Sequence, residues 1–191
     1  MKKHNTIRTF IACPIPETAL LLIVDLQDQI RSFEWKIKWV PVTNIHLTLC
    51  FLGDISPSQQ QHIVNAITPV TASHKAFDFS LGNPGVFPNP KRPNVLWLGL
   101  HGHVSQLKAF QANIQSALKP LGFSENKRSF KAHLTLGRIK GPVLEKQMAR
   151  VLCMDIASKQ CQFTCNRLVF YQSKLSRQGA SYSVLNEWIL T

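Results

Sequence analysis

Hydrophobic and polar positions along the chain follow two periods, and these periods predict a mixed α+β protein. Apolar and β-branched runs bounded by turn formers predict strands, whereas apolar residues that recur every three or four positions predict helices. The predicted strands cover residues 6–15, 45–52, 77–81, 94–100, 130–139, 162–171 and 180–190. The predicted helices cover residues 17–33, 57 to about 69, 104 to about 121, and 143–152.

Turn formers and caps set several of these boundaries. In Ser56-Pro57-Ser58-Gln59, the serine can cap a helix, the proline suits its first position, and the glutamine completes a capping box. Pro69 is expected to end this helix. The segment GNPGVFPNPKRP, residues 82–93, predicts a long irregular loop. Residues 35–41 are mixed in character and fit a strand or a loop.

One tetrapeptide occurs twice. His46-Leu47-Thr48-Leu49 returns as residues 133–136, and each copy lies in a predicted strand that follows one helix and precedes another. This order predicts an α+β fold with two similar lobes, each centred on one copy of the repeat. We expect residues 1–191 to form one such bilobal domain.

Side-chain alternation along a strand gives the repeat a chemical meaning. His46 and Thr48 share one face of their strand, as do His133 and Thr135, while the leucines point into the core. A lone strand histidine is more often a hydrogen-bonded structural residue than a catalytic one. Two copies on facing lobes, however, can bring both histidines to one cleft, where a phosphate accepts hydrogen bonds from both threonine hydroxyls.

Two histidines suit in-line displacement at phosphorus. The attacking and leaving oxygens lie on opposite sides of the phosphorus, so one side needs a base and the other an acid. Imidazoles with pKa values near 6.5 can hold these opposite protonation states near neutral pH, and no metal is required. A strained cyclic phosphodiester is a suitable substrate because opening the ring relieves strain.

The residues after each repeat differ. Strict alternation would turn Arg138 away from His133, but Gly137 permits a bulge that returns the guanidinium to the histidine's side, where it could clamp a phosphate. The alternative is an ordinary surface arginine. After the first copy, Phe51 could stack on a nucleobase, but we expect it to fill the core.

Composition narrows the possible partners and location. The net charge is +12, of which +9 falls in residues 96–191, and this favours a polyanion such as nucleic acid over a merely solvated basic face. The chain shows neither a membrane-spanning apolar run nor a signal-type segment, so we expect a cytoplasmic protein with no membrane partner. Its odd count of five cysteines favours reduced thiols.

Four segments together resemble a known family. RTFIACPIP (8–16), NIHLTLCFLGDI (44–55), GVFPNPKRPNVLWLGL (85–100) and NKRSFKAHLTLGR (126–138) are similar to the LigT-like RNA 2′,3′-cyclic phosphodiesterases of the two-histidine phosphoesterase superfamily. The resemblance covers nearly the whole chain. It implies two pseudo-symmetric lobes, each an antiparallel sheet with flanking helices, around a positively charged central cleft. It also implies metal-independent opening of RNA 2′,3′-cyclic phosphate ends, or of cyclic nucleotides, to 2′-phosphomonoesters.

The resemblance also implies roles for individual residues. His46 would donate a proton to the leaving 3′-oxygen, and His133 would be the base on the attacking water. The phosphate-binding residues would be Thr48, Thr135, Arg138 and Arg128. The segment from Arg128 to Ala132 lacks the prolines that family members often carry there, and this departure puts in doubt how rigidly Arg128 is held. No cofactor is implied, a monomer is expected, and some members also join tRNA halves through 2′–5′ linkages.

Two other interpretations stay open. The chain could be a non-catalytic RNA-binding protein whose basic surface is the footprint and whose histidines are bystanders. A metal enzyme that uses His101-x-His103, at a predicted strand end, is weaker because no Asp or Glu cluster accompanies the pair.

Overall fold

The computed structural model describes residues 6–124, 129–159, 161–176 and 179–191. The helices in this part of the chain are α1 (Glu17–Arg31), α2 (Pro57–Ala72), α3 (Val104–Leu118) and α4 (Glu145–Leu152). The strands are β1 (Ile7–Pro14), β2 (Ile37–Trp39), β3 (His46–Ile55), β4 (Phe77–Phe87), β5 (Val95–Gly102), β6 (His133–Ile139), β7 (Gln162–Cys165), β8 (Arg167–Leu175) and β9 (Ala180–Ile189). This mixed composition, with antiparallel strands, confirms the predicted α+β class.

The strands form one curved antiparallel sheet with the repeat at its centre. The strand order is β7-β4-β5-β6-β3-β1-β8-β9, and β2 pairs with β6 beside β3. The two motif strands, β3 and β6, meet at one pairing, Leu47 with Leu134. The sheet therefore consists of two antiparallel halves joined at the motif strands, an arrangement that fits the two predicted lobes.

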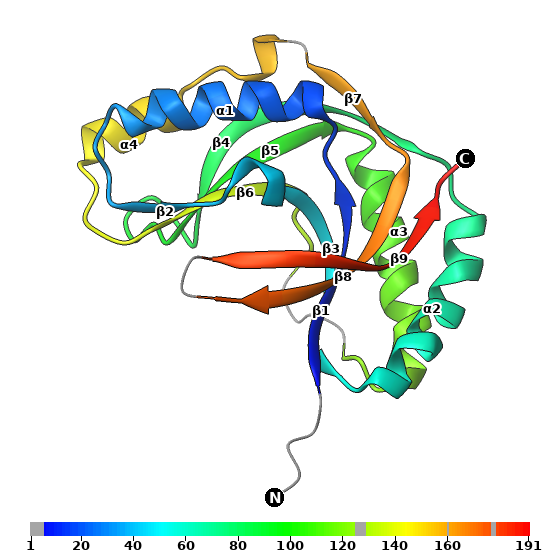
Figure 1. Ribbon diagram of the computed structural model, residues 1–191. Coiled ribbons are helices and arrows are strands. Elements are labelled where there is room, and N and C mark those ends of the chain that lie inside the picture. Colours follow the sequence, from blue (N-terminus) through cyan, green and yellow to red (C-terminus); the bar gives the residue numbers. More distant parts are fainter. Residues whose placement is uncertain (1–5, 125–128, 160, 177–178) are drawn as a thin grey trace, which may run out of the picture.

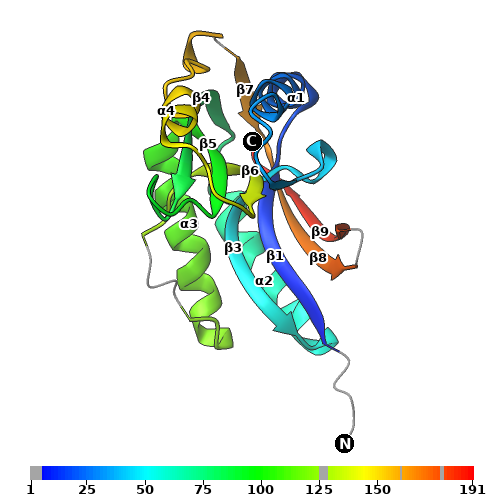
Figure 2. The same ribbon diagram turned by 90° about the vertical axis from the view of Figure 1, so that its left-hand side faces the viewer.

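Helices cover the sheet halves and bury the motif leucines. In Figure 1, α1 lies across the top, and α2 and α3 pack side by side at the right. Figure 2 shows the strands curving between α3 on one side and the β8–β9 hairpin on the other. Leu47, Leu49, Leu134 and Leu136 are all at most 3% exposed, so the predicted core face of the repeat is confirmed.

The predicted loop at residues 82–93 is wrong for its first half. Residues 82–87 continue β4, which pairs with β5 through a register shift between Leu81 and Pro84. The shift lets the strand pass the proline, which has no N–H to donate. Gly85 is required there because a Cβ atom would overlap the Trp97 ring.

Two other boundaries differ from the predictions. Pro69 lies inside α2, and the Thr68 and Thr71 hydroxyls donate to carbonyl oxygens of the surrounding turns. The segment 162–171 is two strands that separate at Asn166 and join different halves of the sheet. The predicted capping box is confirmed, because the Ser56 N–H donates to Gln59 Oε1 at 2.9 Å.

Candidate active site

Both motif histidines are held in the same way. His46 Nδ1 lies 2.8 Å from the carbonyl oxygen of Asn44, and His133 Nδ1 lies 2.7 Å from that of Lys131. A carbonyl oxygen can only accept, so each Nδ1 carries the proton and donates. Each imidazole therefore keeps Nε2 as the nitrogen that can take or give a proton in chemistry.

The strand register brings the two imidazoles to one face. In a regular antiparallel ladder, the pairing of Leu47 with Leu134 sets His46 across from Thr135 and Thr48 across from His133. The two histidines are then diagonal neighbours, at about 7–8 Å in regular geometry. Their charges interact, since His133 contributes to lowering the pKa of His46.

A bulge follows each copy of the repeat. Along β5 and β6, Trp97 pairs with Thr135 and Leu96 with Gly137, so β6 has one extra residue. Arg138 consequently pairs with Val95 and lies on the same face as Thr135, which confirms the bulge predicted from Gly137. Arg138 is exposed there.

The first copy has a matching bulge that the sequence interpretation missed. Thr48 pairs with Ala12 and Cys50 with Ile11, so β3 also carries an extra residue. Phe51 then pairs with Phe10 on the face of His46 and is 64% exposed. The prediction that Phe51 fills the core is wrong, because the bulge reverses its side. Phe51 and Arg138 occupy equivalent positions of the two halves.

Two buried glutamines hold these bulges, and the sequence interpretation also missed them. Gln27 of α1 donates to the carbonyl oxygens of Leu136 and Val40, both at 3.1 Å. Gln111 of α3 donates to that of Leu49 at 3.3 Å. The two glutamines are 2% and 6% exposed. The available signal was a polar residue within the apolar stripe of each helix.

Aromatic rings surround His46. Its ring stacks on Phe10 at 4.7 Å between centroids and meets Tyr182 edge-on at 5.3 Å. Burial lowers the pKa of His46, and the Asn44 carbonyl opposes this shift. Burial raises the pKa of Tyr182, whereas the charges of Arg138 and Arg8 lower it. A cavity of about 180 Å³ lies at this end of the site, and Asn44, His46, Tyr171 and Tyr182 help to line it.

The surroundings of His133 differ from those of His46 because they include a cation, Lys131. Its ring meets Phe87 edge-on at 5.1 Å and Trp97 at 6.3 Å, and Lys131 Nζ lies 4.1 Å from the centroid of the Trp97 ring. Burial lowers the pKa of His133, and the charge of Lys131 lowers it further against the opposing hydrogen bond to the Lys131 carbonyl. Trp97 Nε1 is buried without a hydrogen-bond partner among the described residues.

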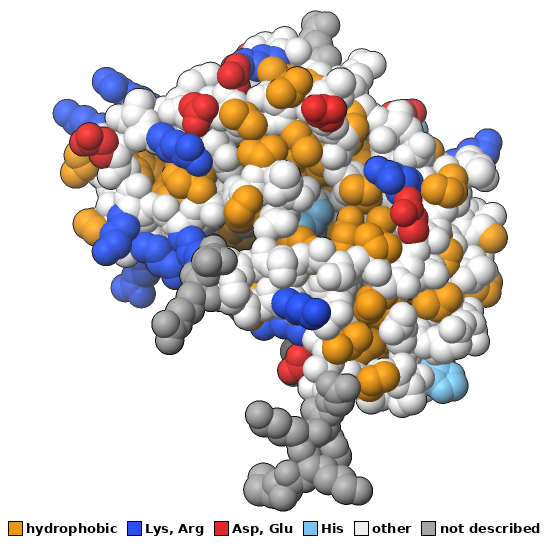
Figure 3. Space-filling model, viewed as in Figure 1, with side chains coloured by type: hydrophobic (Ala, Val, Ile, Leu, Met, Phe, Trp, Pro, Cys, Tyr) orange, Lys and Arg blue, Asp and Glu red, His pale blue; other side chains and the backbone are white. Residues whose placement is uncertain are grey.

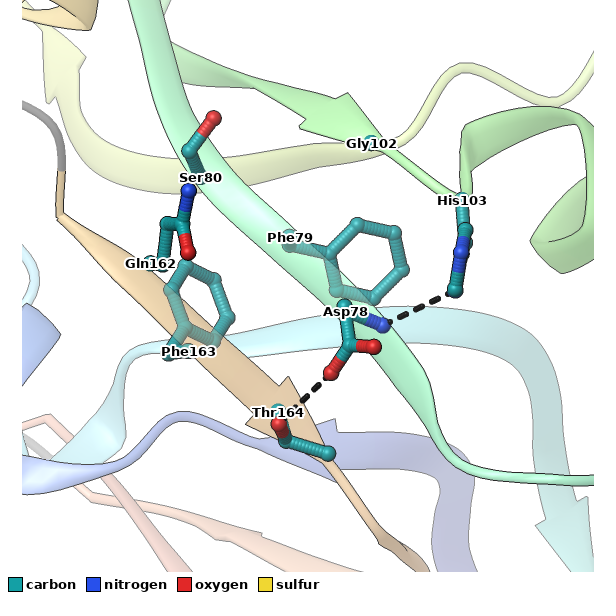
Figure 4. Close-up of a pocket in the computed structure, with 8 residues that line it drawn as sticks. All are labelled: Asp78, Phe79, Ser80, Gly102, His103, Gln162, Phe163 and Thr164. Carbon is teal, nitrogen blue, oxygen red and sulfur yellow. Dashed lines mark hydrogen bonds between the residues drawn. The ribbon is translucent and has the colours of Figure 1, made fainter.

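A second cavity, of about 340 Å³, lies at the β4–β7 ladder and contains His103 (Figure 4). Its polar groups bind one another: the Asp78 N–H donates to His103 Nδ1, and the Thr164 hydroxyl donates to the Asp78 carboxylate. Within the described ranges, no cluster of three or more His, Cys, Asp or Glu residues could hold a metal ion. The predicted Arg128 lies outside the described residues.

The fold and the paired H-x-T strands define a class of phosphoesterase. The family model described as LigT like Phosphoesterase matches residues 14–97 and 100–182, and the chain belongs to this family. Among curated relatives, it is 31% identical over 166 residues to the RNA 2′,3′-cyclic phosphodiesterase of Aeropyrum pernix, covering 85% of this chain and 91% of the relative. The enzyme of the same name from Methanocaldococcus jannaschii is 30% identical over 186 residues, covering 95% and 99%.

Solved structures agree with the fold. The crystal structure of TT0787 from Thermus thermophilus matches with a TM-score of 0.80 at 24% identity, covering 96% of this chain and 98% of that one. Among the described residues, no helix has the length and apolar character needed to cross a bilayer.

Proposed function

We propose that this protein hydrolyses RNA 2′,3′-cyclic phosphate ends to 2′-phosphomonoesters, with His46 and His133 as general acid and base and without a metal ion. One observation carries the proposal: two imidazoles with identical Nδ1 anchoring lie on one face, with interacting charges. The names of the relatives, RNA 2′,3′-cyclic phosphodiesterase, supply the substrate class.

The charges around the histidines support a division of roles. Burial and the charge of Lys131 both disfavour protonation of His133, so His133 is suited to begin as the neutral base. The charged group that lowers the pKa of His46 is His133 itself. While His133 is neutral this repulsion is absent, and the Asn44 carbonyl favours the protonated form of His46 against the effect of burial.

The reaction then follows in-line geometry. Water attacks phosphorus opposite the 3′-oxygen while His133 Nε2 takes its proton, and the P–O3′ bond breaks as His46 Nε2–H protonates the departing oxygen. The Thr48 and Thr135 hydroxyls donate to the non-bridging oxygens, and Arg138 balances their charge. The product carries a 2′-phosphate and a free 3′-hydroxyl.

The 2′–5′ joining of RNA ends uses the same groups. A 5′-hydroxyl of a second RNA replaces water as the attacking group and His133 takes its proton. The P–O3′ bond breaks as His46 protonates the 3′-oxygen, and a 2′–5′ phosphodiester remains. We further propose that residues 1–191 act as one bilobal, monomeric unit. A cytoplasmic location fits its free cysteines, which suit a reducing compartment.

The test is incubation with a 2′,3′-cyclic nucleotide in EDTA, followed by identification of the monophosphate isomer. Wild-type protein should form the 2′-isomer, and either His46→Ala or His133→Ala should lower kcat by about 10²–10⁴-fold. His62→Ala, at an exposed position of α2, is the matched control and should keep full activity.

Circular dichroism of each variant separates lost chemistry from lost folding. Turnover that survives both motif substitutions would refute histidine catalysis. Activity that disappears in EDTA and returns with a divalent metal would refute the metal-independent mechanism. RNA binding without any turnover by the wild type would favour the non-catalytic alternative.

A further inference from the structure

Four cations share one face of the β2–β6 ladder. Lys38 pairs directly with Arg138, and the N–H of Lys140 donates to the carbonyl oxygen of Lys36 at 2.7 Å. The intervening Ile139 points to the core and is 6% exposed, so alternation directs all four cations outward, where they are exposed. We call this group the basic quartet: Lys36, Lys38, Arg138 and Lys140.

The quartet does not stabilise the fold. Like charges directly opposite one another on a ladder are destabilising, and the quartet contains two such cross-strand pairs. Among the described residues, none of its members forms an ion pair with an acidic side chain. Figure 3 shows Lys and Arg side chains gathered over the part of the face where β2 lies in Figure 1. Such a cluster fits an external polyanion.

The quartet continues the active-site face in a definite direction. Arg138 lies on the face of Thr135, and the β3–β6 register sets Thr135 across from His46. The quartet therefore extends outward from the His46 end of the site. In the proposed reaction His46 protonates the 3′-oxygen, so the terminal nucleoside and the RNA attached to it lie at this end.

We propose that the basic quartet binds the backbone phosphates of the RNA strand that precedes the cyclic end, and so makes oligonucleotides better substrates than cyclic mononucleotides. This inference rests on the proposed function. Residues two apart on one strand face are separated by about 7 Å, a spacing that suits successive phosphates of a single strand. The exposed Lys91 and Arg92 lie in the loop between β4 and β5, and this loop ends at Val95, which pairs with Arg138.

The test compares two double variants that each remove two positive charges. Lys36→Gln/Lys140→Gln removes the outer pair of the quartet and leaves Arg138 intact. Lys75→Gln/Lys108→Gln is the matched control at exposed positions before β4 and on α3. Each protein is assayed with a 2′,3′-cyclic mononucleotide, and with a dinucleotide and a hexanucleotide that end in a 2′,3′-cyclic phosphate.

The quartet variant should lose about 5- to 30-fold in kcat/KM on the hexanucleotide and nothing on the mononucleotide. The slope of log kcat/KM for the hexanucleotide against log salt concentration should become less negative by about 1.4. Its thermal stability should equal or exceed that of the wild type, because repulsion is relieved. The control should match the wild type in all three assays.

Equal hexanucleotide kinetics for the two double variants would overturn the quartet's role and leave the proposed hydrolysis standing. The same conclusion follows if the mononucleotide and the hexanucleotide lose activity equally. Wild-type protein that opens neither substrate would overturn both proposals.

Discussion

Gln27 provides a direct test of how the second motif strand is shaped. Its buried amide donates to the carbonyl oxygens of Leu136, the residue at the bulge of β6, and of Val40, just after β2. Gln27→Met keeps the length and flexibility of the side chain but removes both hydrogen bonds. Because the bulge puts Arg138 on the face of the motif histidines, the proposed function predicts that the substitution impairs phosphate binding as well as stability.

The expected loss of stability follows from the hydrogen bonds. Leu136 keeps a second donor, since the Val40 N–H binds its carbonyl oxygen at 3.0 Å. The partly buried carbonyl oxygen of Val40 loses the amide donor, and an acceptor left unsatisfied away from water costs up to about 1–3 kcal/mol. For a chain of this size, such a loss lowers Tm by roughly 2–10 °C.

The assay combines urea unfolding with kinetics on a 2′,3′-cyclic nucleotide at 25 °C, where the variant remains folded. Gln111→Met is the matched variant in the other half, since Gln111 holds the bulge before Phe51 rather than the one before Arg138. Both variants should lose stability, but Gln27→Met should raise KM more. If Gln27→Met unfolds at a lower urea concentration yet keeps wild-type KM and kcat, the glutamine does not position Arg138.

Two further predictions concern pH and packing. Because burial lowers the pKa of both His46 and His133, kcat/KM should peak below pH 6.5 and fall on either side of the peak. Lys131→Gln should raise the pKa of His133 and so move the acidic side of the kcat/KM profile to higher pH. The same shifts mean that the unfolded chain binds more protons near pH 6 than the folded protein does, so the free energy of unfolding should decrease as pH falls from about 6.5. Stability that rises on acidification in this range would contradict the lowered pKa values of the two histidines. Gly137→Ala would put a Cβ atom 2.5 Å from Ile37 Cγ2, and this overpacking should lower the free energy of unfolding, measured in urea, by about 1–3 kcal/mol. An unchanged urea midpoint would show that β2 can shift to accommodate the methyl group.

Much of the fold could be predicted from local patterns. The motif strands, the four helices and the capping box at Ser56 follow from periodicity and end signals. Errors arose where tertiary contacts override local preference. Residues 82–87 look like a loop because of their glycines and proline, yet Gly85 permits the close approach of Trp97, and the pairing with β5 keeps these residues in a strand.

The candidate site shows a similar limit. The repeat predicted which residues point together, and Gly137 predicted a bulge. Nothing in the local sequence indicated the matching bulge before Phe51, because that register shift depends on pairing with β1. Likewise, the basic quartet arises from the pairing of β2 with β6, whose residues are about 100 positions apart in the chain.

The amino-acid sequence by itself determined the chemistry: two imidazoles, two hydroxyls and an excess of positive charge, repeated in two strands whose leucines had to be buried. Only the tertiary structure decided their arrangement. The pairing of β3 with β6 brings both histidines to one face, helix-borne glutamines bind the bulges, and burial lowers the histidine pKa values. The physical reason is that side-chain periodicity is local, whereas strand register and desolvation depend on contacts between distant segments.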